Sequence, residues 1–63
     1  MRSLSEKEKL ILVRIVEGKG NKEIAKDLSV SENTIKVEMR FLFSKLGVKN
    51  RTQAAVYAVK NNL

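Results

Sequence analysis

The sequence contains no cysteine, histidine, proline or tryptophan. Without cysteine the chain can hold no disulfide, no thiol nucleophile and no cysteine-ligated metal. Without histidine it lacks the usual acid–base group near neutral pH. No paired carboxylates or clustered metal ligands stand out in the sequence either. The composition therefore argues against an enzyme, and we expect neither a cofactor nor a metal site.

Long apolar stretches are also missing. A transmembrane helix needs about 20 consecutive apolar residues, and no run in this sequence approaches that length. Nothing at the start resembles a signal peptide. We therefore expect a cytoplasmic location with no membrane partner. The 63 residues have the length of one small domain, and residues 1–63 are predicted to form it.

Acidic residues are scarce in the second half of the chain. The whole sequence has 13 Lys and Arg against 7 Asp and Glu, a net charge of +6. Residues 1–32 are nearly balanced, whereas residues 33–63 carry six cations and Glu38 as their one acid. Such a bias indicates an anionic partner such as nucleic acid, unless the lysines serve only solubility.

Apolar residues recur at helical spacing in four segments, at about residues 5–17, 21–28, 32–46 and 51–62. Ser5, Ser31 and Asn50 are suited to begin helices, and Gly18 and Gly47 to follow helix ends. These patterns predict an all-α four-helix bundle. The short second helix, a three-residue turn and the longer third helix form the pattern of a helix-turn-helix, although helical hairpins in other bundles share it.

The third predicted helix has two contrasting faces. Its apolar stripe consists of Ile35, Met39, Leu42 and Leu46. Its opposite face consists of Asn33, Lys36, Val37, Arg40 and Ser44. Amide, cationic and small apolar groups suit the base edges and phosphates of a DNA major groove, although a solvated polar face has a similar composition.

Several separate motifs resemble the LuxR/FixJ-type (GerE-like) helix-turn-helix domain. They are Leu4-Ser5, Lys7-Glu8, Ile11-Leu12, Gly18, the segment Asn21 to Ala25, Leu28, Ser31, Thr34 to Lys36, Lys45 to Val48 and Arg51 to Ala54. The resemblance covers nearly the whole chain without a gap. It implies a DNA-binding domain of a bacterial transcription regulator, whose third helix enters the major groove and whose fourth helix forms a dimer.

The resemblance also implies roles for individual residues. Base contacts fall at Lys36, Val37 and Arg40. Contacts to the DNA backbone fall at or near Asn21, Lys22, Thr34 and Lys45. The dimer surface falls near Thr52, Gln53 and Val56. The expected partners are double-stranded DNA and a second copy of the chain. If the chain is the C-terminal part of a longer regulator, the expected partners also include a receiver or sensor domain and RNA polymerase.

Four residues depart from the family pattern. Glu38 occupies a position where many members have His, and it has three candidate partners: Arg14, Lys45 or a cytosine amino group. Phe41 replaces a residue that is usually polar, and it contacts either thymine methyls or a protein. Leu10 and Val13 replace charged residues and should be partly exposed, either as a docking surface or as scattered surface residues.

Two other functions remain open at this stage. A domain like region 4 of sigma factors has a similar helix-turn-helix, but the fourth helix beginning Arg51-Thr52-Gln53-Ala54 favours the LuxR type. A protein-interaction module is supported by Leu10, Val13, Phe41 and Tyr57.

Overall fold

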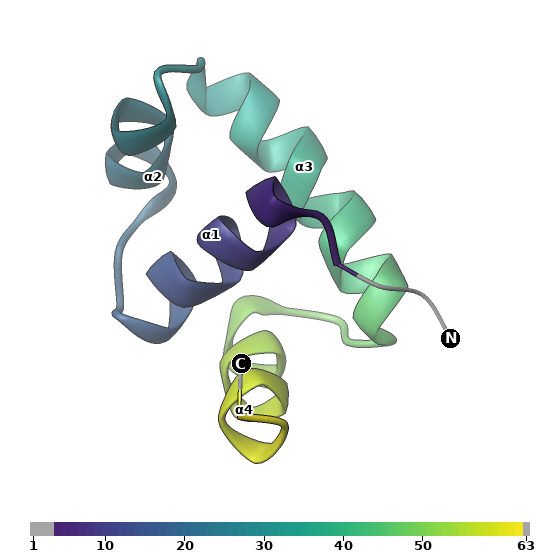
Figure 1. Cartoon of the computed structure of the whole chain (residues 1–63). Coiled ribbons are helices and arrows are strands. Elements are labelled where there is room, and N and C mark those ends of the chain that lie inside the picture. Colours follow the sequence, from purple (N-terminus) through teal and green to yellow (C-terminus); the bar gives the residue numbers. More distant parts are fainter. Residues whose placement is uncertain (1–3, 63) are drawn as a thin grey trace.

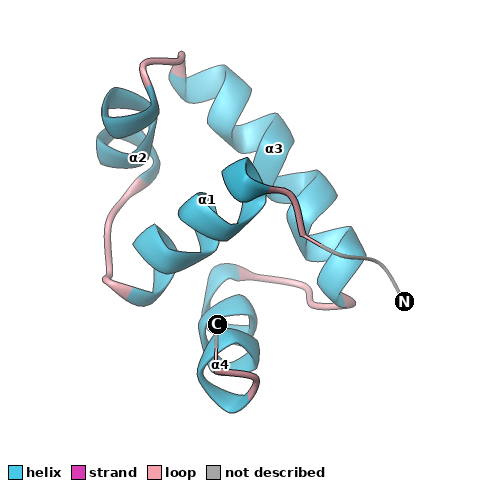
Figure 2. Cartoon of the chain, viewed as in Figure 1, coloured by secondary structure: helices cyan, strands magenta, loops and turns pink. Residues whose placement is uncertain are grey.

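The computed structural model describes residues 4–62, and all regular structure in that part of the chain is helical (Figures 1 and 2). The four helices are α1 (Glu6–Val16), α2 (Asn21–Leu28), α3 (Glu32–Leu46) and α4 (Arg51–Lys60). The prediction of an all-α four-helix fold containing a helix-turn-helix is confirmed. The predicted limits of the first helix, 5 and 17, are its two capping residues.

Local side-chain chemistry begins two of the helices as predicted. At α1 the Ser5 hydroxyl accepts from the Glu8 amide at 3.1 Å, and the Glu8 carboxylate accepts from the Ser5 amide at 2.8 Å. This reciprocal pair is a complete capping box. At α3 the Ser31 hydroxyl accepts from the Thr34 amide at 3.1 Å. Each cap supplies an acceptor for an amide that lacks a partner inside its helix.

The starts of α2 and α4 lack the complete capping box of α1. The cap of α2 is Gly20, and no side chain accepts from its first amides. At α4 the Asn50 side chain accepts from the Gln53 amide, but the Gln53 side chain accepts from Lys49 instead of Asn50. The reciprocal bond of a capping box is therefore displaced by one residue.

The predicted end of the fourth helix at residue 62 was wrong, because α4 stops at Lys60. Asn61 leaves the helical conformation, and Asn62 has a positive φ of 55°. The Asn61 side chain donates to the Tyr57 carbonyl at 2.8 Å. Asparagine tolerates a positive φ better than most residues, so the helix can end here without a glycine.

Ten buried apolar side chains from all four helices make the core. They are Ile11, Leu12, Ile15, Ile24, Ala25, Ile35, Met39, Leu42, Ala54 and Ala58. Leu28 and Leu46 are partly buried and pack against this cluster, and Leu46 was predicted in the apolar stripe of the third helix. Val16, near the end of α1, is 41% exposed. Its position at the last turn of α1 carries it past the side of the helix that faces the core.

The packing separates the helices into two neighbouring pairs. Helix α1 lies across the middle of the molecule and packs chiefly on α4, while α2 packs on α3 (Figure 1). The left-handed Ser29 ends α2 and allows the short turn into α3. One side of α3 packs on the other helices, which leaves its opposite side free to contact a partner.

None of the helices within residues 4–62 is both long enough and apolar enough to cross a membrane.

Candidate nucleic-acid interface

The outer face of α3 carries the predicted base-contacting residues in the open. Lys36, Val37 and Arg40 are all exposed, and Val37 is 47% exposed. With Asn33, Thr34 and Glu38 they line a shallow concavity on the surface. We call Asn33, Lys36, Val37 and Arg40 the α3 outer face. The prediction that this side of the helix is turned away from the core is confirmed, while its use for DNA stays a prediction.

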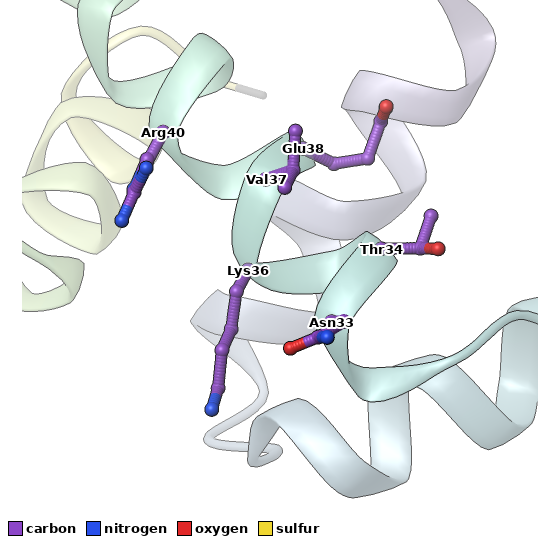
Figure 3. Close-up of a pocket in the computed structure, with 6 residues that line it drawn as sticks. All are labelled: Asn33, Thr34, Lys36, Val37, Glu38 and Arg40. Atoms are coloured by element: carbon purple, nitrogen blue, oxygen red, sulfur yellow. The ribbon is translucent and has the colours of Figure 1, made fainter.

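The side chains around this concavity point in two directions (Figure 3). Asn33, Lys36 and Arg40 extend toward one side of α3, while Thr34 and Glu38 extend toward the other. Val37 lies between the two sets. The surface thus has a cationic edge with an amide, an apolar centre and a second edge with a hydroxyl and an acid. Such a surface can donate to phosphates or to the acceptor atoms of guanine.

Three acidic groups, at the end of α1 and in α2, are held in a network of ion pairs. Arg14 pairs with Glu17 and with Asp27, each at 3.2 Å. Lys19 pairs with Asp27 at 3.4 Å and with Glu23 at 4.0 Å. These pairs join the end of α1 to α2. They also offset acidic charge that would otherwise repel a polyanion.

Lys45 is engaged inside the protein. Its ammonium donates to both carboxylate oxygens of Glu8, at 2.8 and 3.0 Å. This ion pair, together with the Ser5 amide, holds the pKa of the Glu8 carboxyl below its usual range. Because the same carboxylate also caps α1, the pair connects the start of α1 to the end of α3. Lys45 as a contact to the DNA backbone stays a prediction.

Arg51 connects the first turn of α4 to the start of α2. Its guanidinium donates to the Lys19 carbonyl at 2.6 Å and to the Asn21 side-chain oxygen. It also lies 3.5 Å from the Met39 sulfur in α3. From α4, Arg51 therefore contacts the loop before α2, the start of α2 and α3. Sequence reasoning did not assign it this role, because its partners lie about 30 residues earlier in the chain.

The other predicted backbone contacts lie near the helix-turn-helix. Lys22 is exposed in the first turn of α2, and it makes no ion pair with any residue between 4 and 62. The Thr34 hydroxyl lies 2.9 Å from that of Ser31. Asn21 is half-buried and its side-chain oxygen accepts from Arg51. Its amide nitrogen remains available as a donor.

The surface of α4 presents the three residues predicted for the dimer. Thr52, Gln53 and Val56 are exposed, and together with Val48, Tyr57 and Lys60 they line one hollow. Next to it, Val16, Ala55, Val56, Val59 and Lys60 line a second, mostly apolar hollow. Val56 is 49% exposed and Val59 65%. Helix α4 therefore leaves apolar side chains unburied, while the dimer contact that would cover them stays a prediction.

Comparison with known proteins decides the family. Residues 2–58 match the family described as "Bacterial regulatory proteins, luxR family", with the model called GerE. The chain belongs to this family. The match covers all of α1, α2 and α3 and most of α4. It therefore favours the LuxR type over the region-4 type of sigma factors.

Relatives of this luxR-family chain are transcriptional regulators by name. It is 52% identical over 60 residues to the uncharacterized transcriptional regulatory protein YhcZ of Bacillus subtilis. It is 49% identical over 61 residues to the transcriptional regulatory protein LiaR of the same organism. It is 42% identical over 60 residues to the response regulator protein VraR of Staphylococcus aureus. These matches cover 95%, 97% and 95% of this chain but only 28%, 29% and 29% of the relatives.

The four residues that depart from the family pattern are now placed. Both protein partners predicted for Glu38 were wrong, because Arg14 pairs with Glu17 and Asp27 while Lys45 pairs with Glu8. Phe41 is 65% exposed on α3. Leu10 and Val13 are 40% and 38% exposed on α1, as expected. Their role as a docking surface stays a prediction.

Proposed function

We propose that this luxR-family chain binds double-stranded DNA sequence-specifically, with α3 in the major groove. The observation that carries the proposal is the α3 outer face, on which Lys36 and Arg40 stand exposed beside Asn33 and Val37. Lysine and arginine donate to guanine O6 and N7, asparagine pairs with adenine, and valine suits a thymine methyl. The action proposed is binding and not catalysis.

The surroundings of α3 support this arrangement. Helix α2 packs on α3, and its first turn, at the end of α2 away from the turn of the helix-turn-helix, presents Lys22 and the Asn21 amide. Cationic and amide donors in this place are suited to phosphate oxygens, which fix the register of a protein on the duplex. Thr34 and Lys45 are proposed as further backbone contacts, since a Lys45 ammonium shared with Glu8 still has hydrogen-bond donors to offer.

We propose further that the chain acts as a dimer through α4, with Thr52, Gln53 and Val56 at the contact. One small domain buries little DNA surface, and two copies on two half-sites gain both affinity and specificity. Several of its relatives are named transcriptional regulators, and the chain spans less than a third of their length. On that basis residues 1–63 are proposed as the DNA-binding domain of a longer cytoplasmic regulator, with a receiver or sensor domain and RNA polymerase as partners.

Selection from a randomised duplex pool tests the proposal. We expect the wild-type chain to enrich a defined sequence, whereas a Lys36→Ala/Arg40→Ala variant enriches none. Both residues are exposed, so the double variant should unfold at the same temperature as the wild type. Enrichment of no sequence by the wild-type chain, at any salt concentration that permits binding, would contradict sequence-specific recognition. A chain that binds no duplex but forms a stable complex with a protein would favour the protein-interaction alternative.

A further inference from the structure

The most exposed aromatic side chain in the part of the chain that the structure describes is Phe41, which is 65% exposed. It belongs to α3, one residue after Arg40 and four after Val37. Residues four apart on a helix lie on the same face, so Phe41 and Val37 form a continuous apolar ridge, which we call the Val37–Phe41 ridge. The ridge adjoins the cationic edge that Lys36 and Arg40 make.

The chemistry of the major groove limits what such a ridge can read. Base edges there present hydrogen-bond donors and acceptors and a single apolar group, the C5 methyl of thymine. A phenyl ring placed against donors and acceptors would bury them without partners, which is unfavourable. Placed against a methyl group, it removes apolar surface from water on both sides.

We infer that Phe41 is a specificity-determining residue, which together with Val37 selects sequences with thymine methyls beside the site of Arg40. This inference rests on the proposed function. The two side chains lie about 6 Å apart along the helix axis. That separation is close to two steps of about 3.4 Å along a DNA strand. The ridge therefore fits two methyl groups at next-neighbouring positions.

The position of Phe41 favours DNA over a protein as the occupant of this ridge. Phe41 follows directly on Arg40, and Lys36 lies one turn before that arginine, so the apolar ridge runs beside two exposed cations. A polyanion with apolar groups in its groove complements both features. The other exposed apolar residues, at Leu10, Val13, Val16, Val56 and Val59, belong to α1 and α4.

Uracil substitution tests the inference without knowledge of the natural operator. The probes are two duplexes of one A·T-rich sequence of about 20 base pairs, made once with thymine and once with uracil. An A·U pair keeps the donors and acceptors of an A·T pair and lacks only the methyl. We expect the wild-type chain to bind the thymine duplex at least about threefold more tightly, since burying a single methyl group gives a factor of about four.

Substitutions of Phe41 separate its contribution from other effects of the methyl on DNA. In Phe41→Asn the preference for thymine should fall to less than half of the wild-type ratio, while Phe41→Leu should keep most of it. Leu10→Asn is the matched control, because it makes a similar change at an exposed apolar residue of α1, and it should keep the wild-type ratio. Circular dichroism and thermal unfolding would verify that the exposed substitutions leave the fold intact.

Three results would overturn the inference, and they differ in what else they reject. Equal wild-type binding to the two duplexes rejects the ridge and leaves the proposed DNA binding standing. An unchanged thymine preference in Phe41→Asn rejects the role of Phe41 alone and points to a protein contact for this side chain. Absence of wild-type binding to both duplexes at low salt rejects the proposed function, and the inference with it.

Discussion

At the scale of single residues, the cations of this chain differ in whether their side chains bind other groups of the protein. Lys45 is paired with Glu8 and Arg51 donates to the start of α2, so both serve the fold. Lys36 and Arg40 stand exposed on α3. The proposed base contacts therefore depend on these two exposed cations more than on the net charge of the chain.

Arg40 should behave as a base-reading residue. Arg40→Ala should lose about 1–3 kcal/mol of binding free energy on the sequence selected by the wild type, and discrimination at one base position should relax. Lys22→Ala should instead weaken binding uniformly across sequences and reduce the slope of log affinity against log salt by about one. Anisotropy titrations of matched and mismatched duplexes measure both. An equal loss for Arg40→Ala on every sequence would assign it to a phosphate.

Glu8 should stabilise the fold in a pH-dependent manner. Its lowered pKa means that the folded state favours the charged carboxylate. The stabilisation is therefore complete well above the ordinary pKa of about 4.3 and is lost as the pH falls through the lowered value. Glu8→Gln keeps an oxygen to accept from the Ser5 amide but removes the ion pair. It should destabilise the protein at pH 7 by about 1–3 kcal/mol. This loss lies between the values typical of exposed ion pairs and of buried ion pairs.

Unfolding by urea at two pH values checks this expectation. The difference between wild type and Glu8→Gln should shrink markedly between pH 7 and pH 3. Glu6→Gln is the matched control, because Glu6 lies in the same turn with its side chain 94% exposed, and it should change stability little at either pH. An equal destabilisation by Glu8→Gln at both pH values would show that the ion pair with Lys45 does not stabilise the fold.

At the scale of elements, the position of α3 depends on contacts from several directions. Ser31 caps its first turn, Lys45 in its last turn pairs with Glu8, and Arg51 approaches it at Met39. Helix α2 packs along it. The face that carries the proposed base contacts is thus held by its neighbours before any partner arrives, and pre-organisation of this kind lowers the entropy lost on binding.

Arg51 should hold the start of α2 in place. Arg51→Ala removes hydrogen bonds from a charged donor, which contribute about 1.5–3 kcal/mol each, and leaves the Asn21 side chain without this partner. We expect a loss of about 1–3 kcal/mol in the free energy of unfolding, only partly recovered in Arg51→Lys, because lysine lacks the planar fork of arginine. Hydrogen exchange of the α2 amides should accelerate more than that of α1.

The exposed Lys60, at the other end of α4, supplies the comparison for Arg51. Lys60→Ala should leave both stability and exchange close to the wild type. If Arg51→Ala proves as stable as Lys60→Ala, the contacts of Arg51 with Lys19 and Asn21 do not hold the elements together.

Most element-scale features could be predicted because their causes are local. The caps at Ser5 and Ser31 and the glycines after α1 and α3 act over a few residues, and the periodicity of α3 assigns its outer face. The pairs Glu8–Lys45 and Arg51–Lys19 could not be predicted, since their partners lie 37 and 32 residues apart and no local pattern selects them. The exposure of Val16 likewise depends on how α1 packs against α4.

At the scale of the whole molecule, two surfaces of different character are left open. One is the cationic outer face of α3. The other is the mainly apolar surface where α1 meets α4, with Val16, Val56 and Val59 exposed. Membership of the luxR family is consistent with the proposal that the α3 outer face contacts DNA and that the apolar surface of α1 and α4 contacts a protein.

Val56→Lys should separate DNA contact from dimer formation. Because Val56 is about half exposed, the substitution should leave the fold intact. It should abolish cooperative binding to an inverted repeat of the selected sequence while leaving affinity for a single half-site unchanged. Titrations of the two duplexes measure this directly. The same substitution at Val13 on α1 should keep cooperativity, and its loss there as well would show that the α4 surface is not the specific contact.

The central claim is that the exposed cations Lys36 and Arg40 of α3 bind DNA, and a salt-dependent titration tests it most directly. A duplex of the sequence selected by the wild type is titrated with the chain by fluorescence anisotropy at about 50 and about 200 mM salt. For several phosphate contacts we predict a loss of affinity of tenfold or more between the two concentrations, and a weaker affinity at both concentrations in Lys36→Ala/Arg40→Ala. No binding at about 50 mM salt, or binding that the double substitution does not change, would contradict the account.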